Sequence, residues 1–458
     1  MMSQLRLTDA AVRFGGTLIN PDCHFDNVTI DSRAISEGDL FVALTGEHFD
    51  AHLFLKDVAE KASGLVVSKP DKTLPLPQWV VADTTQALGD LAKLRRDNFA
   101  GALIAVTGST GKTSVKEAIA AILRHCGSVH ATAGNLNNHI GVPLTLLSMD
   151  SEADLAVIEM GASAGGEIAY LCDIAKPDIA LINNVQTSHI EGFGSVEGIA
   201  SAKGEIYSGL QASGTAILNL DQSWCEQWRA LIADKNLITY SVQDRDADLS
   251  ASAIQLLSNG CYQFLLCVAA MADRPAYKQQ IELSVPGAHQ VNNALAAAAC
   301  AIAAGANGQQ IAAGLASVNA VAGRLEIKTA PSGAIVIDDS YNASPSSFEV
   351  AIDVLANYSG RRVLVMGDMG ELGDDASSLH CQVGSYAQQA GIDALYSLGH
   401  LSANASQAFG GTHFEERDLL AVALTQEMQS APVTFLVKGS RSAQMENTVD
   451  MLLTRGNV

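Results

Sequence analysis

A glycine-bracketed loop joins a predicted strand to a predicted helix at residues 105 to 116, AVTGSTGKTSVK. Glycines let backbone amides turn toward an anion, a helix N-terminus adds positive potential, lysine adds a charge, and a threonine hydroxyl can reach Mg²⁺. The residues of this loop are Gly108, Ser109, Thr110, Gly111, Lys112, Thr113 and Ser114. It is two residues shorter than the common G-x-x-x-x-G-K-[ST] pattern. The spacing therefore predicts a site for a nucleotide phosphate.

Two further polar groups follow in the same part of the chain. Glu159 closes the apolar run of VIEMGAS, and TAGNLNNHIGVP at 132–143 contains Asn135, Asn137 and Asn138. A carboxylate at the C-terminal end of a parallel strand, beside a phosphate loop, usually holds Mg²⁺. The alternative for Glu159 is a charge at a helix N-terminus, and an asparagine-rich turn can be an ordinary connector.

Other candidates also come after predicted strands. His189 follows one in NNVQTSHIEGFGS, although a lone histidine is more often a packing or surface residue. Acidic strand ends in the last third could bind ribose hydroxyls or a substrate amine, or they could cap helices. They are Asp338 and Asp339, with Tyr341 and Asn342, and Asp368 and Glu371, with Gly367 and Gly370.

Composition excludes several classes of protein. The 28 basic and 49 acidic residues leave a formal charge of −21, which repels a nucleic-acid backbone. The N-terminus lacks the apolar core of a signal peptide, and the longest apolar stretch, 294–306, is shorter than the roughly 20 residues of a membrane span. We therefore expect a soluble, cytoplasmic protein without nucleic-acid partners. The eight cysteines form no CxxC pair, which argues against a zinc ribbon or a disulfide scaffold.

The chain alternates strand-like and helix-like segments, which predicts an α/β fold with parallel sheets. Its 458 residues suggest roughly three units. We place their boundaries at 1–100, 101–320 and 321–458. Asn259 and Gly260 stand between two apolar runs and predict a hairpin in an antiparallel appendage, and the alanine-rich stretch 291–315 predicts helix.

Taken together, these stretches resemble the Mur ligase family, ATP-dependent enzymes that add amino acids to UDP-N-acetylmuramic acid. The short TGSTGKT loop is that family's version of the motif. Further motifs that carry the resemblance are spread over nearly the whole chain in the family's order. They include DSR with GDLFVALTGEHFDAH, GNLNNHIGVPLTLL, AVIEMGAS, SHIEGFGSVEGIASAKGEIYSGL, PGAHQVNNALAAAA, AGRLE, IDDSYNASPSS, GDMGELG and FLVKGSRSAQME.

The resemblance implies an N-terminal α/β domain that binds a UDP-sugar, a central P-loop ATPase with a parallel sheet, and a C-terminal Rossmann-like domain. Within the family it is greatest to members that join D-alanyl-D-alanine to UDP-N-acetylmuramoyl-tripeptide. The implied reaction uses ATP and Mg²⁺ and passes through an acyl phosphate. We expect a monomer.

The resemblance also implies roles around the loop. Lys112 would steady the β- and γ-phosphates, and Thr113 and Glu159 would bind a first Mg²⁺. His189 would face a second Mg²⁺, although imidazole is an unusual partner for that ion. Lys203 stands where the family carries a carbamylated lysine, whereas the residue type alone predicts a solvated helix charge.

The remaining contacts are likewise carried over from the family. Asn293 would contact adenine, with Gln290 standing where the family usually has asparagine, and Arg324 and Asp339 would reach the phosphates and ribose. Other residues are assigned to the two substrates. Asn135, Asn137 and Asn138 would line the path to the γ-phosphate; Asp31, Ser32, Arg33, Thr45 and Gly46 would contact UDP; and Lys438, Ser440 and Arg441 would lie near the dipeptide or form a solvated basic turn.

Rival functions remain within and outside this class. Another Mur-type ligase or a folylpolyglutamate synthase would share the loop, but the DNPR signature of the diaminopimelate-adding enzyme is absent. A GTPase switch should carry an NKxD motif, which the chain also lacks. An inactive scaffold has no need to keep Lys112, Glu159, His189 and Lys203 together.

Overall fold

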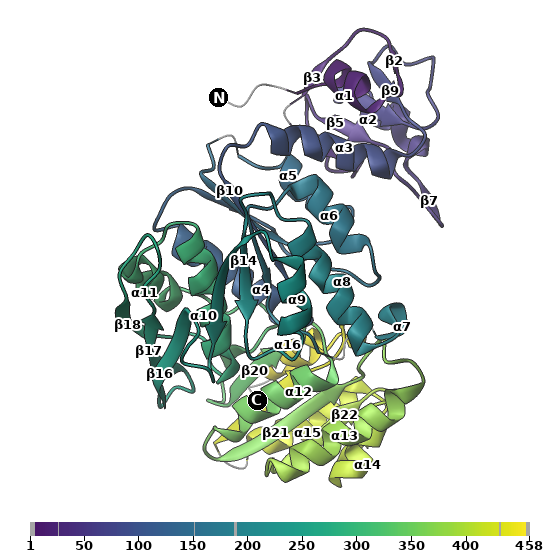
Figure 1. Cartoon of the computed structure of the whole chain (residues 1–458). Coiled ribbons are helices and arrows are strands. Elements are labelled where there is room, and N and C mark those ends of the chain that lie inside the picture. Colours follow the sequence, from purple (N-terminus) through teal and green to yellow (C-terminus); the bar gives the residue numbers. More distant parts are fainter. Residues whose placement is uncertain (1–4, 26, 151, 187–189, 430–431, 455–458) are drawn as a thin grey trace.

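Among the described residues, three β-sheets of five or more strands follow one another along the chain, each covered by helices (Figure 1). The computed structural model describes residues 5–25, 27–150, 152–186, 190–429 and 432–454. The N-terminal block lies at one end of the molecule, the C-terminal block at the other, and the largest sheet lies between them (Figure 1). The α/β class and the three-domain arrangement are confirmed, while the residue boundaries stay predictions.

The N-terminal sheet has five short strands in the order β2-β9-β8-β5-β4. All neighbours pair in parallel except β2 and β9. The strands are β2 (Thr17–Ile19), β9 (Gln78–Val80), β8 (Gly64–Val67), β5 (Leu40–Val42) and β4 (Val28–Thr29), and the helices are α1 (Leu7–Phe14), α2 (Leu55–Val58) and α3 (Thr84–Asp97). The block also carries a small hairpin of β6 (Thr45–Gly46) and β7 (Phe49–Asp50).

The central sheet has nine strands in the order β11-β12-β10-β13-β14-β15-β16-β17-β18. Pairing is parallel from β11 to β16. The strands are β10 (Ala102–Thr107), β11 (Val129–Ala131), β12 (Leu155–Glu159), β13 (Ile179–Ile182), β14 (Thr215–Asn219), β15 (Asn236–Ser241), β16 (Leu249–Leu256), β17 (Tyr262–Val268) and β18 (Tyr277–Glu282). The helices are α4 (Lys112–Leu123), α5 (Gly141–Leu147), α6 (Glu167–Ala175), α7 (Ile190–Phe193), α8 (Val196–Ser208), α9 (Cys225–Leu231), α10 (His289–Ala303) and α11 (Gly308–Ala316).

Helices cover both faces of this sheet, which explains why its strands read as continuous apolar runs. Successive residues of β10 alternate between two buried clusters. Leu103 and Ala105 pack with residues of α3, α5, α6 and α8. Ile104 and Val106 pack with residues of α4, α10 and α11. Each fully buried aliphatic side chain of this kind contributes about 1.5–3 kcal/mol.

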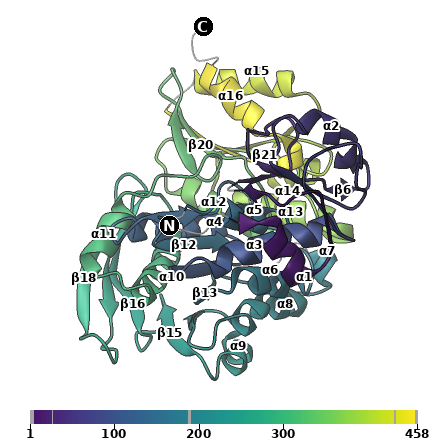
Figure 2. The same cartoon turned by 90° about the horizontal axis from the view of Figure 1, so that it is seen from above.

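The predicted hairpin is confirmed, but it is part of the main sheet. β16 and β17 pair antiparallel around the turn that contains Asn259 and Gly260, and Gly260 has a φ of 80°. β18 adds a further antiparallel strand, while β16 itself pairs in parallel with β15. The expected appendage is therefore an extension of the central sheet. Together with α11 it forms one side of the central domain in both views (Figures 1 and 2).

The alanine-rich stretch forms two helices rather than one. α10 ends at Ala303, and Asn307 caps α11 with a reciprocal capping box to Gln310. Small side chains let these helices pack closely. A Cβ on Gly314 would lie 2.4 Å from the Cα of Ile122 in α4, for example. The tight packing of α11 on α4 thus depends on that glycine.

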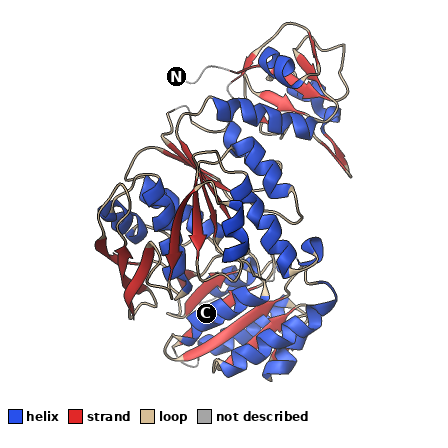
Figure 3. Ribbon diagram, in the orientation of Figure 1, coloured by secondary structure: helices blue, strands red, loops and turns tan. Residues whose placement is uncertain are grey.

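The C-terminal sheet has the order β19-β20-β24-β21-β22-β23. All neighbours pair in parallel except β19 and β20. The strands are β19 (Glu326–Thr329), β20 (Ile335–Asp339), β21 (Arg361–Gly367), β22 (Ala394–Leu398), β23 (Thr412–Phe414) and β24 (Val433–Lys438). The helices are α12 (Pro345–Ala356), α13 (Ala376–Gln389), α14 (Ala403–Phe409), α15 (Arg417–Met428) and α16 (Glu446–Thr454), and Figure 3 shows them on both faces of the strands.

Across the described residues, no helix combines the length and the apolar character that a bilayer crossing requires.

A hydrogen-bonded cluster in the C-terminal domain predicts how stability depends on pH. Glu427 of α15 accepts hydrogen bonds from Arg361 Nη2 at 2.7 Å and from the Tyr396 hydroxyl at 2.6 Å. The bond from Arg361 lowers the pKa of Glu427, although burial acts in the opposite direction. A lowered carboxyl pKa stabilises the fold above the unfolded pKa, and this contribution disappears as pH falls through the folded value.

Replacement of Glu427 by Gln (E427Q) should therefore cost about 1–3 kcal/mol at pH 7, with a smaller cost at pH 4 and below. Urea unfolding at both pH values measures the difference. The exposed Glu415, replaced by Gln, is the matched control and should change neither midpoint. An equal loss for E427Q at every pH would contradict the assignment.

Candidate active site

The predicted phosphate loop runs from the end of β10 to the start of α4. Gly111 is the residue before α4 and has a φ of 72°. A Cβ at this position would lie 2.8 Å from Asn183 Nδ2, so both the conformation and the space require glycine. The first turn of α4 leaves backbone N–H groups without helical partners, and these are suited to bind an anion.

Two asparagines that follow β13 hold the backbone of the loop by hydrogen bonds. Asn184 accepts from the backbone N–H groups of Ser109 and Thr110, both at 2.9 Å. Asn183 donates to the carbonyl of Thr110 at 3.1 Å and to Asn293 Oδ1 at 3.2 Å. The sequence alone assigned no role to these two residues. Their signal in the sequence was a pair of amides directly after a predicted strand. The structure shows that this strand, β13, pairs with the loop strand β10.

Lys112 folds back over its own loop. Its Nζ donates to the carbonyls of Gly108 at 2.8 Å and Ser109 at 3.3 Å. Burial lowers the pKa of Lys112, while the carboxylate of Glu159 acts in the opposite direction. Within the part of the chain that the structure describes, these two carbonyls are the hydrogen-bond partners of the half-buried ammonium, which is suited to receive the charge of a phosphate.

Glu159 is held from both sides at the end of β12. Thr113 Oγ1 donates to Glu159 Oε2 at 2.8 Å, and Asn137 Nδ2 donates to Glu159 Oε1 at 2.7 Å. The backbone N–H of Glu159 donates to Thr132 Oγ1 at 2.9 Å, and Lys116 Nζ holds the Thr132 carbonyl at 2.7 Å. The carboxylate is only 1% exposed and lies against the loop threonine. It is therefore not a helix N-terminal charge.

Lys203 lies inside the protein on α8, with an exposed fraction of 3%. Its Nζ is 5.9 Å from the centre of the Phe193 ring. Burial lowers the pKa of Lys203 to about 7, and repulsion from Lys112 adds to the effect. A solvated helix charge would show neither property. His189 lies outside the described residues.

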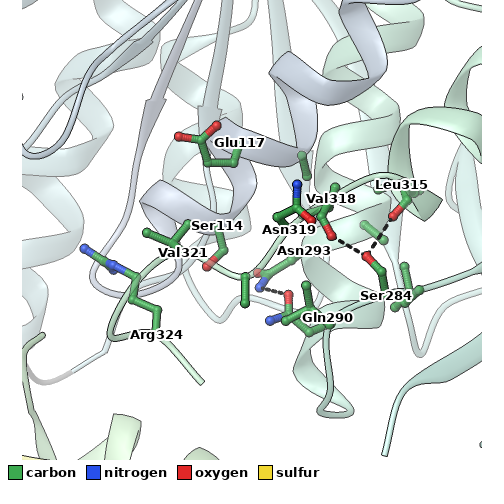
Figure 4. A pocket seen from close by; sticks show the side chains of 15 residues that line it. Ser114, Glu117, Ser284, Gln290, Asn293, Leu315, Val318, Asn319, Val321 and Arg324 are labelled. Atoms are coloured by element: carbon green, nitrogen blue, oxygen red, sulfur yellow. Dashed lines mark hydrogen bonds between the residues drawn. The ribbon is translucent and has the colours of Figure 1, made fainter. Parts of the chain in front are cut away.

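A cavity of about 470 Å³, open to solvent, lies next to the loop (Figure 4). Its wall includes the predicted residues Ser114, Asn293 and Arg324. Asn293 Nδ2 donates to Gln290 Oε1 at 3.0 Å, which leaves the amide nitrogen of Gln290 for another partner. Other lining residues were not predicted from the sequence. They are Glu117, Ala118, Leu283, Ser284, Val285, Ala294, Leu315, Val318, Asn319, Ala320 and Val321.

The C-terminal domain contributes charged groups beside this cavity. Arg324 lies over the Tyr341 ring at 4.4 Å, and among the described residues its buried Nε has no hydrogen-bond partner. Asp339 accepts from Lys438 Nζ at 2.6 Å and from the Leu325 N–H at 3.1 Å. Burial raises the pKa of Asp339 despite these contacts.

The predicted UDP contacts lie in the N-terminal block, away from the loop (Figure 1). Asp31 binds Arg33 through both carboxylate oxygens, at 2.9 and 2.8 Å, and Ser32 lies between them, half-buried. Thr45 and Gly46 form one strand of the β6–β7 hairpin. The predicted UDP contacts therefore belong to the N-terminal block, whereas the phosphate loop belongs to the central domain.

The three asparagines of the 132–143 segment have different surroundings. Asn137 binds Glu159, as described above. Asn138 Oδ1 accepts from the N–H of Gly141 at 2.8 Å and so supports the start of α5. Asn135 is exposed. Among the described residues, no group of three or more His, Cys, Asp or Glu side chains forms a metal cluster.

Comparison with known proteins agrees with this geometry. Residues 106–301 match the Mur ligase middle domain, and residues 323–441 match the Mur ligase, glutamate ligase domain. The UDP-N-acetylmuramoyl-tripeptide--D-alanyl-D-alanine ligase of Escherichia coli strain K12 is 44% identical over 454 residues, which cover 98% of each chain.

Solved structures agree over nearly the full length. MurF from Acinetobacter baumannii superimposes with a TM-score of 0.91 at 33% identity and covers 99% of this chain and 100% of its own. MurF from Thermotoga maritima, solved in complex with ADP, gives a TM-score of 0.81 at 26% identity, covering 94% and 97%. With two family domains matched in order and close similarity along the whole length, this chain belongs to the Mur ligase family.

Proposed function

We propose that this chain is an ATP-dependent ligase that joins D-alanyl-D-alanine to the terminal carboxylate of UDP-N-acetylmuramoyl-tripeptide, with release of ADP and phosphate. This is a step of peptidoglycan precursor synthesis. The name of the 44% identical relative supports the choice of substrates. The observation that carries the chemistry is the contact of Thr113 with Glu159 directly beside Lys112 in the short phosphate loop.

The reaction needs ATP because a carboxylate is a poor acylating agent. The tripeptide carboxylate oxygen attacks the γ-phosphorus of ATP, the bond to the β-phosphate oxygen breaks, and ADP leaves. The amine of D-alanyl-D-alanine then attacks the acyl carbon, the carbon–oxygen bond to phosphate breaks, and the amine loses a proton. One amide forms for each phosphate released.

Lys112 would stabilise the phosphoryl group during this transfer. Without a ligand, burial disfavours the charged form of Lys112 and so lowers its pKa. Bound phosphates would supply the missing negative charge and favour the ammonium form. The backbone amides of Gly111, Lys112 and Thr113 at the start of α4 would hold the same anion, while Asn183 and Asn184 keep the loop in shape.

The donor set suits Mg²⁺, which prefers oxygen ligands and is usually bound through one or two carboxylates plus phosphates. Glu159 and Thr113 supply a carboxylate and a hydroxyl at one point, 2.8 Å apart. When bound, the ion would neutralise charge on the phosphate oxygens. Asn137, which we expected to line the substrate path, also orients the Glu159 carboxylate. His189 stays a proposed ligand of a second ion.

Lys203 would act after modification. Its pKa of about 7 means that a large fraction of the side chain is the neutral amine at physiological pH. A neutral amine adds CO₂ at nitrogen and loses a proton, which gives a carbamate with two oxygens. The carbamate is anionic, so it would remove the repulsion between Lys203 and Lys112 and provide an oxygen ligand.

The cavity beside α4 would hold the nucleoside of ATP. Apolar side chains suit a base, and Asn293 and Gln290 supply amide groups for its edge. Arg324 and Asp339 would contact the phosphates and ribose from the C-terminal domain.

The UDP contacts at Asp31, Ser32, Arg33, Thr45 and Gly46 remain proposals, as do the monomeric state and the cytoplasmic location.

The substrate requirement is the direct test of this function. Phosphate release from ATP should need both UDP-N-acetylmuramoyl-tripeptide and D-alanyl-D-alanine. Because acylation depends on Lys112, replacement of this residue by Ala should lower the rate by at least about 100-fold. Coupled phosphate detection measures both results. Release with a single amino acid in place of the dipeptide would overturn the assignment.

The role of Lys203 predicts chemical rescue. Replacement of Lys203 by Ala should abolish most activity, and short carboxylic acids such as formate or acetate should restore part of it by supplying the missing oxygens. Mass spectrometry of the intact wild-type protein under CO₂ provides a readout apart from activity, since a carbamate adds the mass of CO₂. Failure of rescue together with an unmodified Lys203 would refute the carbamate.

Gly111 offers a test of the loop. Replacement by Ala should cost about 1–2 kcal/mol of stability because of the positive φ, and it should also weaken ADP binding because the new Cβ meets Asn183. Gly410 has a φ of 81° at the end of α14, where an added Cβ would meet no atom within 4 Å, and it serves as the matched control. Its Ala variant should lose stability but bind ADP normally. Calorimetric titration with ADP separates the two variants, and equal ADP affinity in both would exclude the loop role.

A further inference from the structure

Gln186 lies between the phosphate loop and the C-terminal domain. Its carboxamide oxygen accepts hydrogen bonds from Thr110 Oγ1 at 3.0 Å and from Ser346 Oγ at 2.9 Å. Thr110 belongs to the phosphate loop, whereas Ser346 is the second residue of α12 in the C-terminal domain. One side-chain atom thus connects elements that are 236 positions apart in the sequence, residues 110 and 346.

The backbone of Gln186 is also tied to the loop. Ser109 Oγ donates to the Gln186 carbonyl at 3.0 Å and accepts from the Gln186 N–H at 3.0 Å. An amide oxygen has two acceptor positions, and in Gln186 both are used by hydroxyl groups. A change in the loop must therefore move Gln186 or break one of these bonds.

Ser346, the partner of Gln186 in the C-terminal domain, lies at a well-capped helix start. Ser344 caps α12, its Oγ accepts from the Ser347 N–H, and Pro345 occupies the first helical position. Proline at this position is pre-organised for a helix start. Ser346 therefore projects from a rigid helix, and α12 packs on the C-terminal sheet through Phe348, which is fully buried. A displacement of Ser346 accordingly requires the C-terminal domain to move with it.

We propose that Gln186 is a positioning residue that couples the phosphate loop to the C-terminal domain through its carboxamide oxygen. The C-terminal domain carries Arg324, which lines the nucleotide cavity, so the placement of this domain affects nucleotide binding. Because coupling between two sites is reciprocal, a correctly placed C-terminal domain favours the nucleotide-binding form of the loop, and bound nucleotide favours that placement. The inference rests on the proposed function only in taking ATP as the ligand.

Calorimetric titration of the full chain with a non-hydrolysable ATP analogue tests the coupling without any catalysis. Replacement of Ser346 by Ala should weaken binding about fivefold, because one neutral hydrogen bond is lost. Replacement of Gln186 by Ala should weaken it at least as much. The double variant should bind like the Gln186 variant alone, since both changes remove the same interdomain bond. Ser346→Thr keeps the hydroxyl and should restore wild-type affinity.

Glu349, an exposed residue of the same helix, is the control, and its Ala variant should bind like the wild type. Wild-type affinity in the Ser346→Ala variant would overturn the proposal, as would fully additive losses in the double variant. Should Gln186→Ala fail to fold, the comparison of Ser346→Ala with Ser346→Thr decides the matter alone. A wild-type protein that binds the analogue but does not ligate the dipeptide would refute the proposed function and leave this coupling test intact.

Discussion

The hydrogen bond between Thr113 and Glu159 joins the phosphate loop at the start of α4 to the end of β12. Glu159 ends a fully buried strand, and burial of an unpaired carboxylate in such a place would be costly. Thr113 and Asn137 each satisfy one of its oxygens, so the position of the carboxylate depends on both α4 and the 132–143 segment. The phosphate loop, the asparagine-rich segment and the central strands consequently form a single unit.

That unit lies at one edge of the central sheet because its strands are parallel. β10, β12 and β13 pair in register, so their C-terminal ends present Gly108, Glu159 and Asn183 next to one another. The C-terminal domain approaches this edge with Arg324 and with Ser346, which reaches Gln186. The residues proposed as catalytic therefore come from the central domain, and the C-terminal domain completes their surroundings.

Much of this arrangement could be predicted from the sequence. The loop, its strand and its helix are local features, and the pattern around residues 105 to 116 predicts all three. The sequence predicted fewer of the contacts between segments that are distant along the chain. Asn183 and Asn184 were recognised only as residues after a strand, since nothing in their own segment shows that β13 lies beside β10. Glu117 and Asn319 likewise line the cavity because α4 and the segment after α11 happen to meet there.

By itself, the sequence determined the α/β class and the phosphate loop, because these depend on residue type and short-range spacing, and its resemblance to a family supplied most of the other candidate residues. Only the tertiary structure decided the charge and the hydrogen-bond partners of the individual side chains. Lys203 reads as a surface charge on a helix, yet burial beside Lys112 lowers its pKa to about 7. Gln186 reads as a loop residue, yet it accepts a hydroxyl from each of two domains. Burial and contact between distant segments arise only when the chain has folded, and they set the charge and the partners of each side chain.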